Sequence, residues 1–372
     1  MVQGGFILDR RALFGAAAAA PFALAAPAVA QTQSPEVRWR LASSFPRTLD
    51  ILYGGCENIA RRVAELSANR FQIRCFPAGE IVPALQTLDA VQSNSIEITQ
   101  TAPYYFIGKE PSFAFYTAVP WGLNVRQMTA WLHHGGGNAF GDELFNDYNC
   151  YGIAAGDTGA QMGGWWRKEI KSLADLQGVK FRIGGLGGQV FAKVGVSPTQ
   201  IAGGDIYPSL ERGVIDAAEW VGPYDDEKLG FARVAPYYYT PGFWEGSSRN
   251  YFLINKPAWT ALPDDYKAIL RIACAEQVQA MSAHFDAANP AALRRLVASG
   301  TQLRAFPRDV LQALWNATHE VFDEISGRDA RFKKIWTNYR AFRDDQFSWF
   351  RVLETSYDNF AQQAAAAATA RR

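Results

Sequence analysis

The chain has 372 residues, of which 37 are lysine or arginine and 36 are aspartate or glutamate, so its net charge is +1. This balance excludes the strongly basic face with which nucleic-acid-binding proteins attract phosphate. The length allows two lobes with cores of their own, and the 13% aromatic content suits small-molecule pockets as well as large interfaces.

The first 30 residues have the pattern of an export signal. A twin arginine at positions 10 and 11 precedes an alanine-rich apolar stretch, and residues 28–30 (AVA) fit the small-x-small cleavage pattern. The apolar run is short and contains prolines, which argues against a membrane anchor. We therefore expect residues 1–30 to be a twin-arginine signal peptide and the mature protein to be periplasmic; an ordinary secretory signal is the alternative.

Strand and helix patterns alternate at the start of the mature chain, which predicts an α/β fold. Residues 37–42, 71–76 and 95–99 have the features of strands, whereas residues 51–66 and 81–91 carry apolar side chains at helical spacing. Together these segments predict a β-α-β-α-β unit, half of a doubly wound sheet.

A second unit of the same kind follows. Its predicted strands are residues 151–155, 179–183, 217–221 and 250–256. Between them, residues 172–178 begin like a capping box, and Asp205 has the character of a helix N-cap.

Helices dominate the rest of the chain. The expected elements are a helix over 264–288, another that begins at Pro290, a strand over 301–306 and helices over 307–326 and 329–368. A helix of forty residues is about 60 Å long, and the last one carries aromatic residues along its length. We therefore expect it to cross both lobes or to reach a second subunit.

The four cysteines, Cys56, Cys75, Cys150 and Cys274, do not show CxxC spacing, which argues against a metal knuckle. An export compartment permits disulfides. Four cysteines allow three pairings, however, and buried free thiols are the other possibility, so the sequence leaves the pairing open. The HExxH and GxSxG signatures of hydrolases do not occur in the sequence.

The stretch KFRIGGLGGQV, residues 180–190, is the first candidate site. An extended run ends in Arg182, and four glycines occur in the five positions 184–188. A dinucleotide fingerprint would need a glycine where Val190 stands, so a tight strand-to-helix turn fits better. Arg182 then lies at the C-terminal end of a strand, where open α/β sheets bind ligands. A guanidinium suits a carboxylate ligand; a structural carboxylate partner is the alternative.

Longer segments carry a family resemblance. Residues 163–183 and 198–220, with 78–92 and 102–123, resemble the solute-binding proteins of TRAP (tripartite ATP-independent periplasmic) transporters. They are similar to the branch that binds 2-oxo acids such as pyruvate. The resemblance covers nearly all of residues 36–360. It implies a two-lobed fold with hinge strands and a long C-terminal helix, no catalysis, and delivery of a small organic acid anion to TRAP membrane subunits.

The resemblance and the element pattern together suggest a division of the chain. We expect lobe I to contain residues 31–155 and 247–289, and lobe II to contain residues 156–246 and 290–328. Residues 329–372 would form the long C-terminal helix. Some members of this branch pair by exchanging that helix, so we expect a homodimer through it.

The resemblance also implies roles for individual residues. Arg182 matches the cleft arginine that holds the ligand carboxylate, and Gln161 matches a polar pocket position. Tyr104 and Trp220 are candidate walls of the binding site. An aromatic residue taken alone is more often part of the core than of a pocket.

A cation beside the ligand would be held by Glu219, by the backbone carbonyl of Trp220 and by Glu245. The branch is expected to have glutamine at the last position, so this chain carries an additional carboxylate there. Two glutamates and an anionic ligand exceed the charge of Arg182, and oxygen ligands suit Ca²⁺ or Na⁺. We expect a bound metal cation, with Ca²⁺ narrowly favoured. A metal-dependent enzyme and a ligand-sensing module are the alternative functions.

Overall fold

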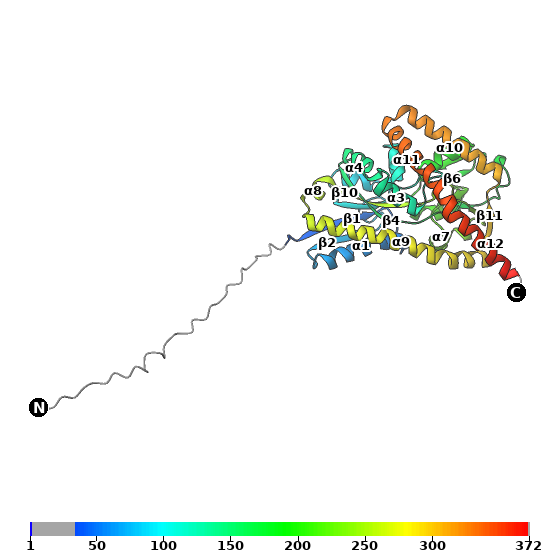
Figure 1. The fold of residues 1–372 in the computed structure, drawn as a ribbon. Coiled ribbons are helices and arrows are strands. Elements are labelled where there is room, and N and C mark those ends of the chain that lie inside the picture. Colours follow the sequence, from blue (N-terminus) through cyan, green and yellow to red (C-terminus); the bar gives the residue numbers. More distant parts are fainter. Residues whose placement is uncertain (2–33, 371–372) are drawn as a thin grey trace. The chain divides into compact units, whose positions relative to one another are not determined.

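The computed structural model describes Met1 and residues 34–370. The chain divides into the units Met1–Pro35 and Glu36–Arg372, and the fold described here is that of the second unit (Figure 1). The expected signal peptide, residues 1–30, lies outside the described residues except for Met1. In the part of the chain that the structure describes, no helix combines the length and apolar character needed to cross a membrane.

The unit contains two sheets. The first has five strands in the order β2-β1-β3-β10-β4, and the second has six in the order β11-β9-β5-β8-β6-β7. In the first sheet, β1, β2 and β3 are parallel and β10 is antiparallel to both of its neighbours. The strands of the first sheet are β1 (Val37–Ser43), β2 (Phe71–Phe76), β3 (Ile98–Thr101), β4 (Cys150–Asp157) and β10 (Arg249–Asn255).

In the second sheet, β6, β7 and β8 are parallel, and β5 is antiparallel to both β8 and β9. Its strands are β5 (Trp165–Trp166), β6 (Lys180–Arg182), β7 (Ser197–Thr199), β8 (Ala217–Ala218), β9 (Tyr237–Thr240) and β11 (Gln302–Ala305). The parallel arrangement of β6 and β8 is what positions the candidate site.

The chain passes between the sheets along three segments. Residues 158–164 lead from β4 to β5, and residues 241–248 lead back from β9 to β10. The third passage is α9 (Asp264–Ala298), which runs past β4 and α1 at one end and past α7 at the other (Figure 1).

Helices cover the sheets and complete the fold. They are α1 (Leu52–Leu66), α2 (Thr87–Gln92), α3 (Val125–His134), α4 (Gly137–Asp147), α5 (Gly185–Lys193), α6 (Gly203–Glu211), α7 (Pro223–Leu229), α8 (Lys256–Ala261), α9, α10 (Arg308–Arg328), α11 (Ala330–Phe350) and α12 (Ser356–Ala370). A π-helical segment, Arg351–Thr355, joins the last two. The long C-terminal helix that was expected is therefore continuous from Ala330, as predicted.

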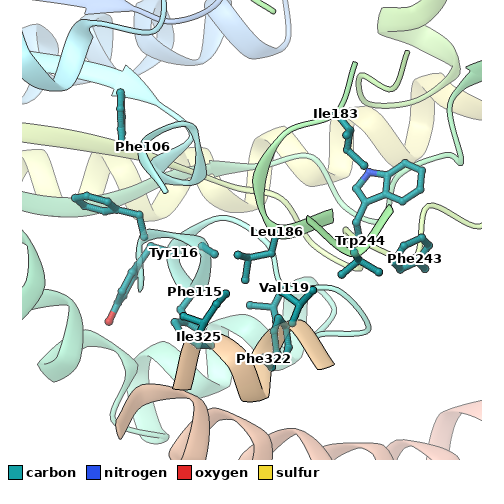
Figure 2. Close-up of a cluster of buried hydrophobic side chains, with 14 of the residues drawn as sticks. Phe106, Phe115, Tyr116, Val119, Ile183, Leu186, Phe243, Trp244, Phe322 and Ile325 are labelled. Carbon is teal, nitrogen blue, oxygen red and sulfur yellow. The ribbon is translucent and has the colours of Figure 1, made fainter. Parts of the chain in front are cut away.

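Two clusters of buried apolar side chains hold the unit together, and each includes residues from both sheets. Figure 2 shows part of one cluster, in which Leu186 of α5 lies near Phe115 and Val119, with Phe322 and Ile325 of α10 beside them. The segments around the two sheets are thus in direct apolar contact.

Two expected helices differ in the structure. Residues 81–91 form a helix only from Thr87, because the preceding segment contains Pro83 and makes turns instead. Pro290 does not begin a new helix but lies inside α9, which continues to Ala298. Asp205 lies in the first turn of α6, whose N-cap is Ala202.

Candidate functional site

Arg182 and Glu219 lie side by side because their strands are parallel. Arg182 is the last residue of β6 and aligns with Ala218 of β8, so Glu219 directly follows that strand. The backbone N–H of Glu219 donates to the carbonyl of Arg182 over 3.1 Å. Both side chains therefore occupy the carboxyl edge of the sheet, where α/β folds bind ligands.

The Arg182 guanidinium is buried, with 1% of the residue exposed. Its Nε donates to the Ile201 carbonyl over 3.0 Å, and its Nη1 donates to the Glu219 carbonyl over 2.8 Å and forms an ion pair with the Glu219 carboxylate. The guanidinium carbon lies 5.1 Å from the centre of the Trp220 ring, in cation–π contact. Arg182 thus has a structural carboxylate partner, and the Tyr105 hydroxyl also lies beside the guanidinium. The Nη2 donors have no other partner among the described residues.

The glycines that follow Arg182 make room for an aromatic ring. A Cβ on Gly184 would lie 2.9 Å from the Tyr104 ring, and one on Gly185, where φ is +62°, would lie 2.4 Å from it. The Gly184 N–H donates to Oε1 of Glu219 over 3.0 Å. The glycine run is therefore a turn that admits Tyr104 and supports Glu219, which agrees with the strand-to-helix interpretation.

Glu245 reaches the same place from the passage between β9 and β10. Its backbone N–H donates to Gly242, and its carbonyl accepts from the N–H of Gln161, over 3.1 and 3.0 Å respectively. The bond with Gln161, together with one from the Gly242 N–H to the Gln161 carbonyl, joins the two connecting segments. Glu245 is 1% exposed, so its carboxylate lies inside the protein.

Four buried oxygens of this group lack a hydrogen-bond partner among the described residues. They are both carboxylate oxygens of Glu245, Oε2 of Glu219 and Oε1 of Gln161. Buried polar atoms are nearly always paired, and an unpaired buried carboxylate is costly. The arrangement therefore has the capacity to accept a proton or a cation.

The pKa values of both glutamates are raised. Burial raises the pKa of Glu245 well above its ordinary value, and the charge of Glu219 raises it further. The Tyr104 and Ser248 hydroxyls lie near this carboxylate and oppose the rise without forming a regular hydrogen bond. Burial also raises the pKa of Glu219, although the Arg182 charge opposes it. A cation that binds here competes with a proton.

Next to these groups is a hollow of only about 10 Å³, roughly the room of one water molecule. Arg182, Glu219 and Glu245 do not line it themselves; the Trp220 ring, which contacts Arg182, lies between. Three residues that the sequence predicted, Tyr104, Gln161 and Trp220, line it. Sequence reasoning missed several others, because apolar residues on core elements give no signal of a pocket and lone polar residues at strand ends give little. The missed residues include Phe45, Leu52, Ala102, Thr158, Ser248 and Asn250.

The paired tryptophans of the second sheet belong to the core. Trp165 and Trp166 form the short strand β5, and neither lines the hollow. The Trp165 indole N–H donates to Oδ2 of Asp226 over 2.9 Å. These side chains pack within the second sheet.

A second buried acidic pair, Asp225 and Asp226, adjoins Trp220. Burial raises the pKa of Asp225 to about 8 and that of Asp226 to about 7. Asp226 accepts hydrogen bonds from Trp165 and from the Tyr238 hydroxyl, whereas neither oxygen of Asp225 has a partner within residues 34–370. In the sequence PYDDEK these residues look like an exposed helix start, so their burial could not be predicted.

We expect this pair to make the protein less stable as the pH rises. An unfolded aspartate loses its proton near pH 3.9, whereas Asp225 holds its proton to about pH 8. The stability that the proton provides is therefore full below pH 4 and is lost between about pH 4 and pH 8. Asp225→Asn should raise the free energy of unfolding at pH 8 by roughly 2 kcal/mol or more, measured by urea unfolding. The exposed control Asp205→Asn should change nothing; equal pH profiles for wild type and Asp225→Asn would contradict this assignment.

Comparisons with known proteins show that the chain is similar to one protein family and to several individual proteins. The model of a family described as bacterial extracellular solute-binding protein, family 7, matches residues 42–329. A monocarboxylate 2-oxoacid-binding periplasmic protein of Nostoc sp. is 46% identical over 364 residues, which are 96% of this chain and 100% of the relative.

Two solved structures are also similar. A TRAP transporter solute-binding protein from Bordetella bronchiseptica is 47% identical with a TM-score of 0.89, and the match covers 90% of this chain and 100% of the other. It is described as a mixed-occupancy dimer with copurified calcium and picolinate in one active site and an apo second site. A TRAP periplasmic solute-binding protein from Pseudoalteromonas atlantica, with bound sodium and pyruvate, is 34% identical with a TM-score of 0.85, over 87% of this chain and 99% of the other.

Proposed function

Because this chain belongs to family 7 of the bacterial extracellular solute-binding proteins, we propose that it binds a monocarboxylate 2-oxo acid such as pyruvate, together with a metal cation, in the periplasm. It would deliver the acid to TRAP membrane subunits. Members of this family bind solutes and are not enzymes. The observation that carries the proposal is a buried guanidinium, Arg182, grouped with two buried carboxylates of which three oxygens, both of Glu245 and Oε2 of Glu219, lack partners among the described residues.

The chemistry of the relatives' ligands supports this substrate class. Pyruvate and picolinate, bound by the two solved relatives, both carry a second donor atom beside a carboxylate. Such a ligand can chelate a cation while its carboxylate remains available to an arginine. The site in this chain offers Nη2 of Arg182 for the carboxylate, with Tyr104, Gln161 and Trp220 as surrounding walls.

The residues present fit a cation. Glu219 and Glu245 provide buried oxygens without partners, and the Trp220 carbonyl accepts no hydrogen bond from residues 34–370. Within the described residues no three or more His, Cys, Asp or Glu side chains are placed so that they could together hold a metal ion, so this carbonyl and the ligand's own oxygens would complete the coordination. A bound cation would supply positive charge that offsets the two glutamates and the anionic acid.

We favour Ca²⁺ over Na⁺ at this site. With both glutamates ionised and a monoanion bound, Arg182 alone leaves an excess of negative charge, and a divalent ion neutralises more of it than a monovalent one. Calcium also tolerates flexible oxygen coordination. Calcium occurs in the Bordetella relative and sodium in the Pseudoalteromonas relative, so both ions suit this fold.

Binding would require the walls of the hollow to separate, because about 10 Å³ does not admit a three-carbon acid. We propose that lobe I, residues 31–155 and 247–289, and lobe II, residues 156–246 and 290–328, move about the connecting segments. Contacts made only when the lobes are closed would then retain the ligand.

One such contact is a group around Asp50, in the loop between β1 and α1. The Tyr224 hydroxyl donates to Oδ2 of Asp50 over 3.0 Å, and Lys228 forms an ion pair with Oδ1. Both partners belong to α7, which follows β8 of the second sheet. Asp50 thus connects segments of the two proposed lobes.

We expect Asp50→Asn to raise the dissociation rate of pyruvate by about twofold to fivefold, because a half-exposed ion pair contributes about 0.5–1 kcal/mol. Stopped-flow measurements should show the effect shrinking at high salt. Glu276→Gln is the matched control, since its half-exposed ion pair with Arg62 joins α1 to α9 outside the site. An unchanged dissociation rate in Asp50→Asn would mean that this contact does not retain the ligand.

We also propose that the protein forms a homodimer through its C-terminal helix. The first half of α11 packs on the body through Phe332, Trp336 and Tyr339. Beyond it the apolar side chains face outward, and Tyr357 and Phe360 are 72% and 75% exposed. Exposed apolar patches of this kind usually mark an interface, and the Bordetella relative is described as a dimer.

Removal of residues 351–372 should convert the dimer to a folded monomer, because this truncation keeps the buried contacts of α11. Sedimentation at micromolar concentration would measure the change. Asp358→Asn and Gln362→Glu, on the same segment, serve as controls and should leave the dimer intact. A monomer from the full mature chain would show that the exposed residues do not form an interface.

The twin arginine supports a related proposal about export. We propose that residues 1–30 direct the folded protein through the twin-arginine route. Replacement of both arginines by lysine should stop export without affecting folding of the mature chain.

Native mass spectrometry of the exported protein tests the proposed function as a whole. The expected species carries one 2-oxo acid and one metal ion per chain, and incubation with pyruvate and calcium should restore it after stripping. Failure of the stripped protein to bind any 2-oxo acid under these conditions would overturn the proposal.

A further inference from the structure

The structure distinguishes among the four cysteines, whose pairing the sequence leaves open. All four are present as thiols. Burial alone raises the pKa values of Cys150 and Cys274, and no other thiol contributes to either shift. Cys56 is different, because the Cys75 thiol lies close to it and, besides burial, raises its pKa.

Cys56 and Cys75 come from two elements that pack together. Cys56 lies in α1 and is fully buried, and Cys75 lies in β2 and is half-buried at the edge of the first sheet. In the alternating strand β2, Cys75 shares the face of Phe71 and Ile73, which belong to the same core cluster as Cys56. The two thiols also both influence the neighbouring Tyr53 hydroxyl, so the three groups are close together.

We propose that Cys56 and Cys75 are joined by a disulfide in the exported protein, and that Cys150 and Cys274 remain thiols. The proposal rests on the periplasmic location, and it is independent of the ligand and of the cation. The required oxidant is a protein disulfide, of the class that supplies disulfides to exported proteins.

Thiol–disulfide exchange with the donor must begin at Cys75, because Cys75 is half-buried whereas Cys56 is fully buried. The Cys75 thiolate attacks one sulfur of the donor disulfide, the donor S–S bond breaks, and one donor thiolate leaves. Cys56 then loses its proton to water and attacks the Cys75 sulfur, which breaks the mixed disulfide and releases the second donor thiolate. Two electrons pass to the donor. Burial raises the pKa of Cys56 well above its ordinary value, which makes this second step the slower one.

The bond would fix the first turns of α1 to the edge of the first sheet. Cys56 lies one turn after Leu52, which lines the hollow and whose carbonyl accepts from Nε2 of Gln100 over 2.7 Å. A disulfide would close a loop of about 20 residues and restrict the unfolded chain accordingly. It would also protect an exposed sheet edge from opening.

Thiol counting tests the proposal directly. The protein is purified from the periplasm without reductant, denatured and alkylated with N-ethylmaleimide, and its intact mass is measured. We expect two of the four cysteines to be alkylated, and proteolysis to yield one peptide pair that links residues 56 and 75. Reduction should lower Tm by about 3–10 °C. Four alkylated cysteines, or a different linked pair, would overturn the proposal.

A second experiment tests formation of the Cys56–Cys75 bond in vitro, independently of export. Reduced protein from the cytoplasm is mixed with the small-molecule disulfide hydroxyethyl disulfide. Cys56→Ala should accumulate a mixed disulfide at Cys75, whereas Cys75→Ala should not react, and the control Cys150→Ser should still form the internal bond. Formation of Cys75-linked dimers in place of the internal bond by the wild type would contradict the pairing.

Discussion

Arg182→Ala is expected to weaken pyruvate binding by roughly 2–5 kcal/mol, or about 30-fold to several thousandfold, because it removes the buried cation that faces the ligand carboxylate. Titration calorimetry measures the change. Arg182→Lys should also bind poorly, since a single ammonium cannot serve Ile201, Glu219 and the ligand as the guanidinium does.

This variant needs a control for folding, because Arg182 also stabilises Glu219 through their buried ion pair. The double variant Arg182→Ala/Glu219→Gln leaves no unpaired charge at this position. It should unfold nearer to the wild-type temperature and still fail to bind. Arg40→Ala, which removes a half-exposed ion pair with Glu97, should bind normally. Wild-type affinity in Arg182→Ala would exclude the arginine as the carboxylate anchor.

Glu245→Gln is expected to lower calcium affinity by roughly 2–5 kcal/mol, about 30-fold or more, because a buried carboxylate that faces the cation becomes neutral. Glu245→Gln should also reduce the preference of the site for Ca²⁺ over Na⁺, since less negative charge remains to be offset. Calcium titration of the stripped protein in the presence of pyruvate measures both effects.

The pH dependence of this variant provides an independent check. Burial and Glu219 raise the pKa of Glu245, so at low pH the wild-type carboxyl holds a proton that calcium must displace. Calcium affinity should therefore rise with pH, beginning above the ordinary glutamate pKa, and calcium binding should release protons. Glu245→Gln should show a weaker pH dependence. Identical pH profiles would indicate that Glu245 does not contact the cation.

The sequence predicted those parts of the fold in which local pattern and final packing agree. The stretch FQIRCF coincides with β2, in which Phe71 and Ile73 are buried and Gln72 and Arg74 are exposed, although Phe76 at its end is buried as well. The helical spacing of residues 81–91 was misleading, because Pro83 cannot donate a backbone hydrogen bond and Ile81 is 42% exposed. At Pro290 the sequence predicted the start of a new helix, but α9 continues through the proline. Phe285 and Ala292, on either side of it, are buried and keep this part of the chain helical.

The candidate site could be predicted to the extent that it follows from strand ends. Arg182 ends and Glu219 follows one of two adjacent parallel strands, β6 and β8, so their proximity follows from topology. Glu245 lies in a connecting segment, and only the family resemblance pointed to it. Phe45 and Leu52 gave no signal, because an apolar residue that lines a hollow has the same pattern as one in the core. The roles of all these residues remain predictions.

The most direct test of the account is a calorimetric titration of pyruvate into protein that has been unfolded, freed of ligand and metal with EDTA, and refolded in sodium-free buffer. We expect no measurable binding until calcium is added, and tight binding of one pyruvate per chain afterwards, with sodium a weaker substitute. Full affinity for pyruvate without any cation would contradict the claim that Arg182, Glu219 and Glu245 form a joint site for the acid and a metal ion.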